Sequence, residues 1–259
     1  MDNIYDIHLH ARELKTNYIN KNGMGIALSF AHMPKANELV NIQPATAPQL
    51  MPRNDLHLAR NAWHMCMGFV IVGIYVFGDL SRVSAVMTLG CFLGVDLLIE
   101  TARLHIPAFN AQVMKYWGAL MRKSEINRLS GTPYYIGSAV LTIGVFPKPI
   151  AVLSLLYLAC GDPLASAFGI LYGDRSIRFK SGKSLIGTMA GVLTCFLISL
   201  VFFNMYGVNG LTLALLSVLG AIAGGAAEIL PLDVDDNFSI PMVSGFVLWL
   251  AFIACGVTL

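Results

Sequence analysis

Long apolar segments dominate this 259-residue chain and restrict the folds open to it. A helix needs roughly 17–25 mostly apolar residues to cross the hydrocarbon core of a bilayer. Candidate spans lie at residues 61–77, 82–99, 134–146, 149–171, 184–206, 211–229 and 239–258. Apolar residues make up 56% of the chain and charged residues only 12%, about half the charged fraction of an average soluble domain. The sequence therefore predicts an all-α, polytopic integral membrane protein with seven transmembrane helices.

The distribution of basic residues predicts how these helices are oriented. Lys and Arg gather in the cytoplasmic loops of membrane proteins. With the N-terminus inside, nearly all Lys and Arg residues after position 52 fall on the cytoplasmic side, and only Arg82 and Lys148 fall outside. We therefore predict a cytoplasmic, polar N-terminal extension at residues 1–56 and a membrane-embedded domain at residues 57–259. The membrane would be the bacterial inner membrane or the endoplasmic reticulum.

Two cytoplasmic connections are long enough to hold structure of their own. In the first, Phe109, Val113, Trp117 and Leu120 recur at helical spacing, which is typical of an amphipathic helix on the membrane surface. A plain connector anchored by apolar residues would show the same pattern. The second is the basic loop at residues 172–183.

That basic loop contains Gly182-Lys183-Ser184, the end of the P-loop motif of nucleotide-binding proteins. A P-loop also needs a glycine five positions earlier and a preceding β-strand. Ile177 occupies that position, and the preceding segment is too long and apolar for one strand. The P-loop is excluded, but an anion site at the start of the next helix, capped by Ser181 or Ser184, remains open.

Asp162 is the most informative charge inside an apolar segment. A carboxylate at the centre of a transmembrane helix costs roughly 2.5–3.5 kcal/mol, so its presence indicates a functional site. Gly161 and Pro163 flank it and are expected to interrupt the helix and to expose backbone groups to a polar cavity. The alternative is a simple kink in which Asp162 pairs with an arginine.

Other charged residues gather near the same predicted membrane surface. Asp96 and Glu100 lie one helical turn apart with Arg103 following, either as a cluster that reaches the interface or as part of a site. Arg60 and His64 share one helix face, where Arg60 could hold phosphate or anchor the helix.

An acidic turn joins the last two predicted spans. Its oxygen-bearing side chains are Glu228, Asp233, Asp235, Asp236 and Asn237. Such a set suits Mg²⁺, which takes one or two carboxylates together with substrate phosphates, although a solvated turn is the alternative. Carboxylates, lysines and arginines beside a broken span are what phosphoryl or nucleotidyl transfer requires. An acceptor that arrives from the bilayer would be a lipid.

Several motifs together resemble the CTP-dependent lipid kinases, a family that includes the diacylglycerol kinase of the endoplasmic reticulum, dolichol kinase and phytol kinase. The motifs are "ALMRKSEI" with the following Gly131, "GDPLASAFGILYG", "GKSLIGTMAG" and "DDNFSIP". The resemblance begins near Leu58 and is greatest to the diacylglycerol kinase branch. It implies transfer of the γ-phosphoryl group of CTP, with Mg²⁺, to the hydroxyl of a lipid alcohol.

The resemblance also implies roles for individual residues. The essential Asp, Gly and Arg of the family correspond to Asp162, Gly169 and Arg60, whereas the Lys that usually follows the Arg is Asn61 here. Asp162 would be catalytic or bind metal. The expected nucleotide ligands are Arg60, Gly169, Arg178, Gly182, Lys183, Ser184 and Asn237. The metal site would add Asp235 and Asp236. Supporting positions are Asp96, Arg103, Arg122, Lys123, Glu125 and Glu228.

Two other functions remain open at this point. CDP-diacylglycerol synthase, which transfers a cytidylyl group to phosphatidate, also joins a broken span to a Ser- and Lys-containing loop. Its loop contains a proline and a glutamate that "SGKSLIG" lacks. A non-enzymatic lipid transporter would often show inverted repeats, and none is visible. Membrane lipids are expected partners and nucleic acid is not.

Overall fold

The computed structural model describes residues 58–173, 176–179, 181–229 and 234–257. The predicted N-terminal extension and Asp233 lie outside these residues. Within them the chain is helical, and the only β-type pairing is an isolated bridge between Arg178 and Ser184. The helices in chain order are α2 (Leu58–Phe77), α3 (Arg82–His105), α4 (Pro107–Trp117), η2 (Gly118–Leu120), η3 (Lys123–Glu125), α5 (Gly131–Val145), α6 (Lys148–Leu156), η4 (Tyr157–Gly161), α7 (Asp162–Tyr172), α8 (Leu185–Met205), α9 (Gly210–Ile229) and α10 (Asp236–Cys255).

Five of the described helical segments are long and apolar enough to cross a membrane: α3, the joined segment Lys148–Tyr172, α8, α9 and α10. The all-α membrane fold is therefore confirmed. The other two predicted spans correspond to α2 and α5. Helix α5 has 15 residues, and at ~1.5 Å per residue it is shorter than a hydrocarbon core of ~30 Å. A total of seven spans stays a prediction.

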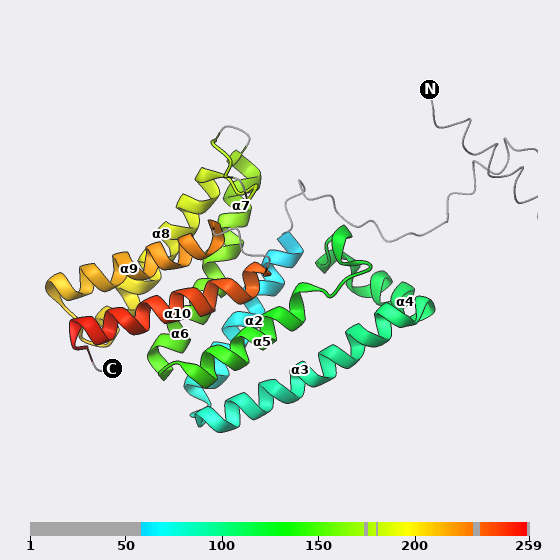
Figure 1. The fold of residues 1–259 in the computed structure, drawn as a ribbon, viewed down its shortest axis with the longest axis horizontal. Coiled ribbons are helices and arrows are strands. Elements are labelled where there is room, and N and C mark those ends of the chain that lie inside the picture. Colours follow the sequence, from blue (N-terminus) through cyan, green and yellow to red (C-terminus); the bar gives the residue numbers. More distant parts are fainter. Residues whose placement is uncertain (1–57, 174–175, 180, 230–233, 258–259) are drawn as a thin grey trace, which may run out of the picture. The chain divides into compact units, whose positions relative to one another are not determined.

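The segment Lys148–Tyr172 lies at the centre of the bundle, and 72% of the residues in its most apolar stretch are buried. Helices α8, α9 and α10 lie side by side next to it, and α2 and α5 pack on its other side (Figure 1). Helix α3 is peripheral, and its exposed apolar side chains suit contact with lipid tails (Val83, Met87, Phe92, Leu98). Asp162 therefore belongs to the most enclosed helix of the described bundle.

The chain around Asp162 differs from the predicted break. The helix is continuous from Lys148 to Tyr172, but Tyr157–Gly161 forms a π-helical turn, η4, directly before Asp162 and Pro163. Pro163 cannot donate a backbone hydrogen bond into the preceding turn, and a wider turn accommodates that loss without unwinding the helix. The irregularity is therefore a π-turn in a continuous helix. It precedes the carboxylate by one residue.

Helix α3 is longer than the predicted span 82–99. It continues to His105, where Pro107 forces Ile106 into an extended conformation (φ −116°, ψ 98°) and ends it. The six additional residues include Glu100 and Arg103, which are buried against each other. Because these two charges pair inside the protein, the helix extends past the point at which sequence hydropathy falls.

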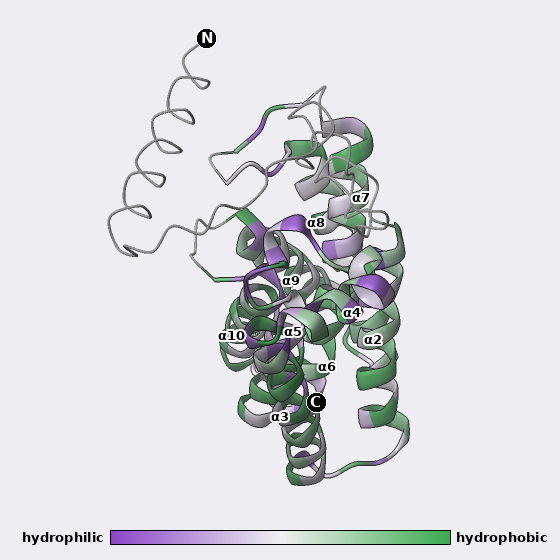
Figure 2. Ribbon diagram, turned by 90° about the vertical axis from the view of Figure 1, so that its right-hand side faces the viewer, coloured by the Kyte–Doolittle hydropathy of each residue, from purple (hydrophilic) through white to green (hydrophobic). Residues whose placement is uncertain are grey.

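Glycines allow α7 and α8 to approach closely beside Asp162. A Cβ atom added to Gly187 would lie 2.6 Å from the backbone oxygen of Ala165 and 2.9 Å from Cα of Gly169. Gly169, the glycine that the resemblance singled out, is thus in contact with α8 across this interface. In Figure 2 the most hydrophilic parts of the ribbon lie around the labels of α8, α10 and α4.

Replacing Gly187 by Ala is expected to lower the free energy of unfolding by about 1–3 kcal/mol, because the new methyl group meets backbone atoms that cannot move aside. Thermal unfolding of the detergent-purified protein measures the effect. Gly94→Ala is the matched control, since a Cβ at Gly94 has no atom within 4 Å. Equal melting temperatures for the two variants would show that the α7–α8 contact is not tight.

Candidate functional site

A polar cavity of about 180 Å³ lies where the first turns of α2, helix α7, the first turns of α8 and the last turn of α9 meet. Four cationic side chains line it, namely Arg60, Arg122, Arg178 and Lys183, together with the carboxylates of Asp162 and Glu228. The sequence-predicted residues Gly169, Gly182 and Ser184 also line it. Most of the predicted nucleotide ligands, distant in sequence, therefore surround one cavity.

Asp162 has a histidine beside it. Its Oδ2 lies 3.5 Å from Nδ1 of His64, and the two side chains are 15% and 7% exposed. The imidazole packs edge-on against the ring of Tyr135, whose hydroxyl donates a hydrogen bond to the backbone oxygen of His64. Nε2 of His64 is buried and has no hydrogen-bond partner among the described residues. The predicted site residues did not include His64, whose only sequence signal is its position one turn after Arg60.

The Gly182-Lys183-Ser184 tripeptide has a separate structural role for each residue. Gly182 has a φ of 81° in a tight turn closed by hydrogen bonds between Phe179 and residues 182 and 183. Ser184 is the N-cap of α8, because its Oγ accepts a hydrogen bond from the backbone N–H of Gly187. Of the two predicted caps, Ser184 is therefore correct and Ser181 is not.

Lys183 extends from this turn toward the carboxylates of two other helices. Its Nζ lies 2.8 Å from Oδ2 of Asp236 and 3.2 Å from Oε1 of Glu228. Burial alone lowers the pKa of Lys183, but the combined attraction of Asp162, Glu228 and Asp236 outweighs burial and raises this pKa above its ordinary value. Lys183 therefore stays positively charged at neutral pH and joins α8 to α9 and α10.

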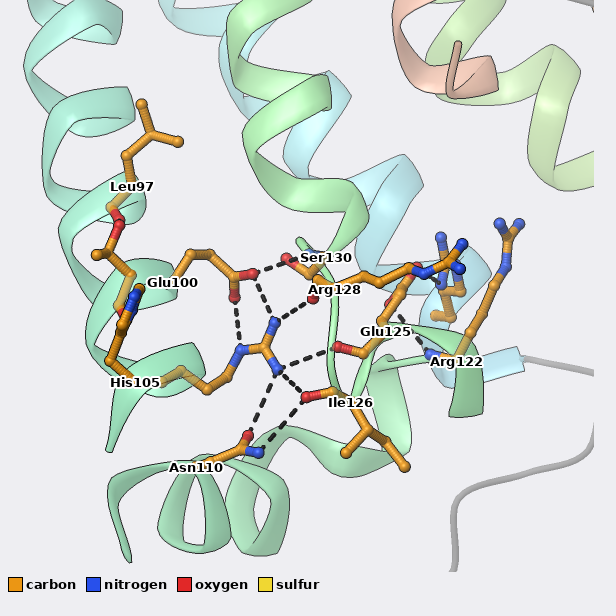
Figure 3. A network of polar contacts seen from close by, with 12 residues as sticks. Leu97, Glu100, His105, Asn110, Arg122, Glu125, Ile126, Arg128 and Ser130 are labelled. Carbon is orange, nitrogen blue, oxygen red and sulfur yellow. Dashed lines mark hydrogen bonds and ion pairs between the residues drawn. The ribbon is translucent and has the colours of Figure 1, made fainter. Parts of the chain in front are cut away.

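A second polar cluster, close to the cavity, is centred on Arg103 (Figure 3). Its guanidinium pairs with both carboxylate oxygens of Glu100 at 3.0 and 2.7 Å. It also donates hydrogen bonds to the backbone oxygens of Glu125, Ile126 and Arg128. Arg103 is 1% exposed and Glu100 is 5% exposed. Glu100 and Arg103 are therefore paired inside the protein, where neither side chain extends to its surface.

The Arg103 cluster holds the segment that positions Arg60. Glu125 accepts hydrogen bonds from Nη1 of Arg60 at 3.0 Å and from the backbone N–H of Arg122 at 3.0 Å. A Cβ atom added to Gly131 would lie 3.1 Å from Nη2 of Arg60 and 2.8 Å from Nδ2 of Asn237. Glu100, Arg103 and Glu125 thus act on the cavity through Arg60 and Arg122.

Not every predicted site residue faces the polar cavity. Asn237 donates a hydrogen bond to the backbone oxygen of Gly131 at 3.2 Å, and Asp235 is the N-cap of α10. Lys123 is exposed and lines neither cavity. Asn61, where the family usually has Lys, does line the polar cavity, and its Nδ2 lies 3.5 Å from the backbone oxygen of Pro163.

The described residues contain no group of three or more His, Cys, Asp or Glu side chains close enough to bind a metal ion by themselves. Two carboxylates, Asp162 and Glu228, do line the polar cavity. Mg²⁺ is commonly bound by one or two carboxylates together with substrate phosphates. The residues present therefore fit a metal ion that enters with a phosphate ligand.

A larger, mainly apolar cavity of about 480 Å³ adjoins the polar one, with Arg60 and His64 lining both. The residues predicted as the apolar face of an interfacial helix, Phe109, Val113, Trp117 and Leu120, line this cavity. The apolar face of α4 therefore borders a cavity of the protein itself. The location of α4 on a membrane surface stays a prediction.

Comparisons with known proteins find similarity to several proteins that are named as lipid kinases. It is 33% identical over 204 residues to CTP-dependent diacylglycerol kinase 1 of Eremothecium gossypii, which covers 71% of this chain and 64% of that protein. It is 29% identical over 210 residues to CTP-dependent diacylglycerol kinase 1 of Schizosaccharomyces pombe, and this match covers 74% of this chain and 92% of that protein. A probable chloroplastic phytol kinase 1 of Glycine max is 34% identical over 134 residues, covering 48% and 44%.

The chain thus spans slightly less than two thirds of the first of these relatives and most of the second. No family model and no solved structure matches it. The names of these relatives, diacylglycerol kinase and phytol kinase, agree with the family that the sequence motifs resemble. The comparisons therefore confirm that the chain resembles the CTP-dependent lipid kinases, and most of all their diacylglycerol kinase branch.

Proposed function

We propose that this protein transfers the γ-phosphoryl group of CTP to the hydroxyl of diacylglycerol and so forms phosphatidate and CDP. The observation that supports this function best is the pair of adjoining cavities. One is polar and rich in cations, the other is mainly apolar, and Arg60 and His64 line both. A phosphate donor and a lipid acceptor could meet there.

In this reaction the acceptor oxygen bonds to the γ-phosphorus while the bond from that phosphorus to the β–γ bridging oxygen breaks. The hydroxyl proton is released. Because the transition state is loose, the protein acts mainly by positioning and by stabilising charge. Lys183, Arg178 and Arg122 would neutralise the phosphates, and Arg60 would hold the group in transfer at the boundary between the cavities.

Asp162 and Glu228 are the carboxylates that would hold Mg²⁺ with the nucleotide. The ion would supply positive charge to the triphosphate. His64, whose Nδ1 lies 3.5 Å from Oδ2 of Asp162, would help to orient this carboxylate. We place the site on the cytoplasmic side of the membrane, which the concentration of Lys and Arg at this end of the helices supports.

Labelled CTP distinguishes the candidate reactions. Purified protein with Mg²⁺, diacylglycerol and γ-labelled CTP should give labelled phosphatidate. Phosphatidate with α-labelled CTP should give no labelled lipid. Label in lipid only in the second reaction would identify a CDP-diacylglycerol synthase. A transporter would label lipid in neither reaction. Parallel assays with ATP, a polyprenol and phytol measure donor and acceptor preference.

Replacing Lys183 by Ala is expected to raise the KM for CTP about tenfold or more, since one charge-assisted phosphate contact is lost. The same change should lower the free energy of unfolding by about 3 kcal/mol, because Glu228, 6% exposed at its side chain, loses its partner. Adding Glu228→Gln should restore the melting temperature while the KM for CTP stays high. Lys123→Ala, at an exposed lysine outside both cavities, is the control. A normal KM for CTP in the Lys183→Ala variant would remove Lys183 from the nucleotide site.

A further inference from the structure

The apolar cavity has walls suited to a lipid body. Aromatic and aliphatic side chains of α2, α4 and η2 make up much of its lining, including Trp63, Phe109, Val113, Trp117 and Leu120. Its volume of about 480 Å³ lies in the range of cavities that bind small molecules. Trp63 and Trp117 pack edge-to-face at 5.7 Å and are 40% and 50% exposed. The cavity therefore reaches the protein surface beside these two rings.

The few polar groups of this cavity are mostly satisfied within the protein. Glu100 binds Arg103 and the backbone N–H of Ser130, and Glu125 binds Arg60 and the backbone N–H of Arg122. Asp96 differs from both. It lies one turn before Glu100 on α3 and lines the cavity, and its Oδ2 is buried without a hydrogen-bond partner among the described residues.

A buried carboxyl oxygen without a partner is costly, so it calls for a donor that the protein itself does not supply. The lining of the cavity restricts what that donor can be. Glu100 and Glu125 are already paired with Arg103 and Arg60, which leaves the carboxylate of Asp96 without a cationic partner in the described lining. An anionic headgroup next to Asp96 would be repelled, whereas the hydroxyl of an uncharged lipid could donate to it.

We propose that the apolar cavity is the binding site for the acceptor lipid and that Asp96 is its recognition residue. The carboxyl group accepts a hydrogen bond from the hydroxyl of an uncharged lipid alcohol, while α2, α4 and η2 contact the part of the apolar body next to that hydroxyl. This inference rests on the proposed lipid kinase function and deepens it. The same carboxylate disfavours the phosphorylated product, which gains negative charge on transfer and is thereby driven from the cavity.

Steady-state kinetics of Asp96 variants test the recognition step. Asp96→Leu removes the hydrogen-bond acceptor and should raise the KM for diacylglycerol about tenfold or more with an unchanged KM for CTP. Asp96→Asn keeps an acceptor oxygen of the same shape and should change the KM for diacylglycerol much less. Since Asn carries no charge, this variant should be inhibited more strongly by phosphatidate than the wild type is.

A matched pair of valine variants tests the cavity itself. Val113→Trp fills space in the cavity and should raise the KM for diacylglycerol several-fold. Val95→Trp introduces the same side chain on the surface of α3, where Val95 is 56% exposed and lines neither cavity. This control should leave kcat and the KM values for CTP and diacylglycerol unchanged. Normal diacylglycerol KM values for both Asp96→Leu and Val113→Trp in an active enzyme would overturn the inference.

Photolabelling separates failure of this inference from failure of the proposed function, because it requires no turnover. A diacylglycerol with a diazirine in one acyl chain should label peptides of α2 and of residues 107–121 in nanodiscs. Unlabelled diacylglycerol should displace it better than phosphatidate does. Labelling elsewhere, or equal displacement by both lipids, contradicts the acceptor site. A wild-type protein that shows the expected labelling but no transfer from CTP would contradict the proposed kinase and leave the lipid site in place.

Discussion

Replacing Asp162 by Asn is expected to lower phosphorylation of the lipid acceptor by roughly 10²- to 10⁴-fold. The amide has nearly the shape of the carboxyl group and keeps an oxygen facing His64, whose Nδ1 lies 3.5 Å from the carboxylate. It lacks the negative charge with which Asp162 would hold Mg²⁺. The initial rate with saturating CTP and diacylglycerol measures the loss. The melting temperature is expected to change little.

Asp79→Asn is the matched control for this variant. Asp79 is exposed in the loop between α2 and α3, at the far end of a 20-residue helix from Arg60, so ~30 Å from the site. It has a positive φ of 45°, which Asn also tolerates. The control should keep full activity. Substantial activity in the Asp162→Asn variant would mean that Asp162 has only a structural role in the helix.

The second large effect is expected on stability, from replacement of Arg103 by Met. This change leaves Glu100 charged, buried and unpaired, and it removes the donor to the backbone oxygens of residues 125, 126 and 128. Loss of one partner of a buried ion pair costs about 3–5 kcal/mol. Because the Arg103 cluster positions Glu125, and through it Arg60, activity should fall along with stability.

Thermal unfolding in detergent and the yield of membrane-inserted protein measure this effect. Arg103→Lys keeps the positive charge but loses the planar set of guanidinium donors. Its melting temperature should lie between those of the wild type and of Arg103→Met. Arg128→Met is the control, because it removes an exposed guanidinium and keeps the backbone oxygen that Arg103 contacts. A normal melting temperature for Arg103→Met would show that the cluster does not stabilise the fold.

The sequence was sufficient to identify residues whose insertion into a membrane is energetically unfavourable. Asp162 stood out because a carboxylate is expensive in an apolar helix, and the helical segments matched their predicted boundaries within a few residues at most positions. The same reasoning could not separate a buried charge cluster from one at the interface. Glu100 and Arg103 would be three residues apart whether they were buried or exposed. Only their contacts with residues 125–130 show that they are buried inside the protein.

His64 shows a second limit. Its position one turn after Arg60 is compatible with many roles, and its contact with Asp162 joins residues 98 positions apart in the chain. The apolar cavity illustrates the same point, since the apolar face of α4 predicts contact with something apolar without indicating what that is. Side-chain spacing along one helix cannot reveal which distant helix lies opposite it.

The sequence by itself determined the all-α membrane fold and the resemblance to CTP-dependent lipid kinases, and it singled out Asp162. Long apolar segments, a carboxylate inside one of them and the order of the motifs can all be read along the chain. Only the tertiary structure decided which residues share a cavity. In it, Lys183 pairs with Glu228 and Asp236. Asn237 and Glu125 do not line the polar cavity, and Asp96 lines the apolar one. The physical reason is that helix packing, which pairs faces from distant segments, sets these distances.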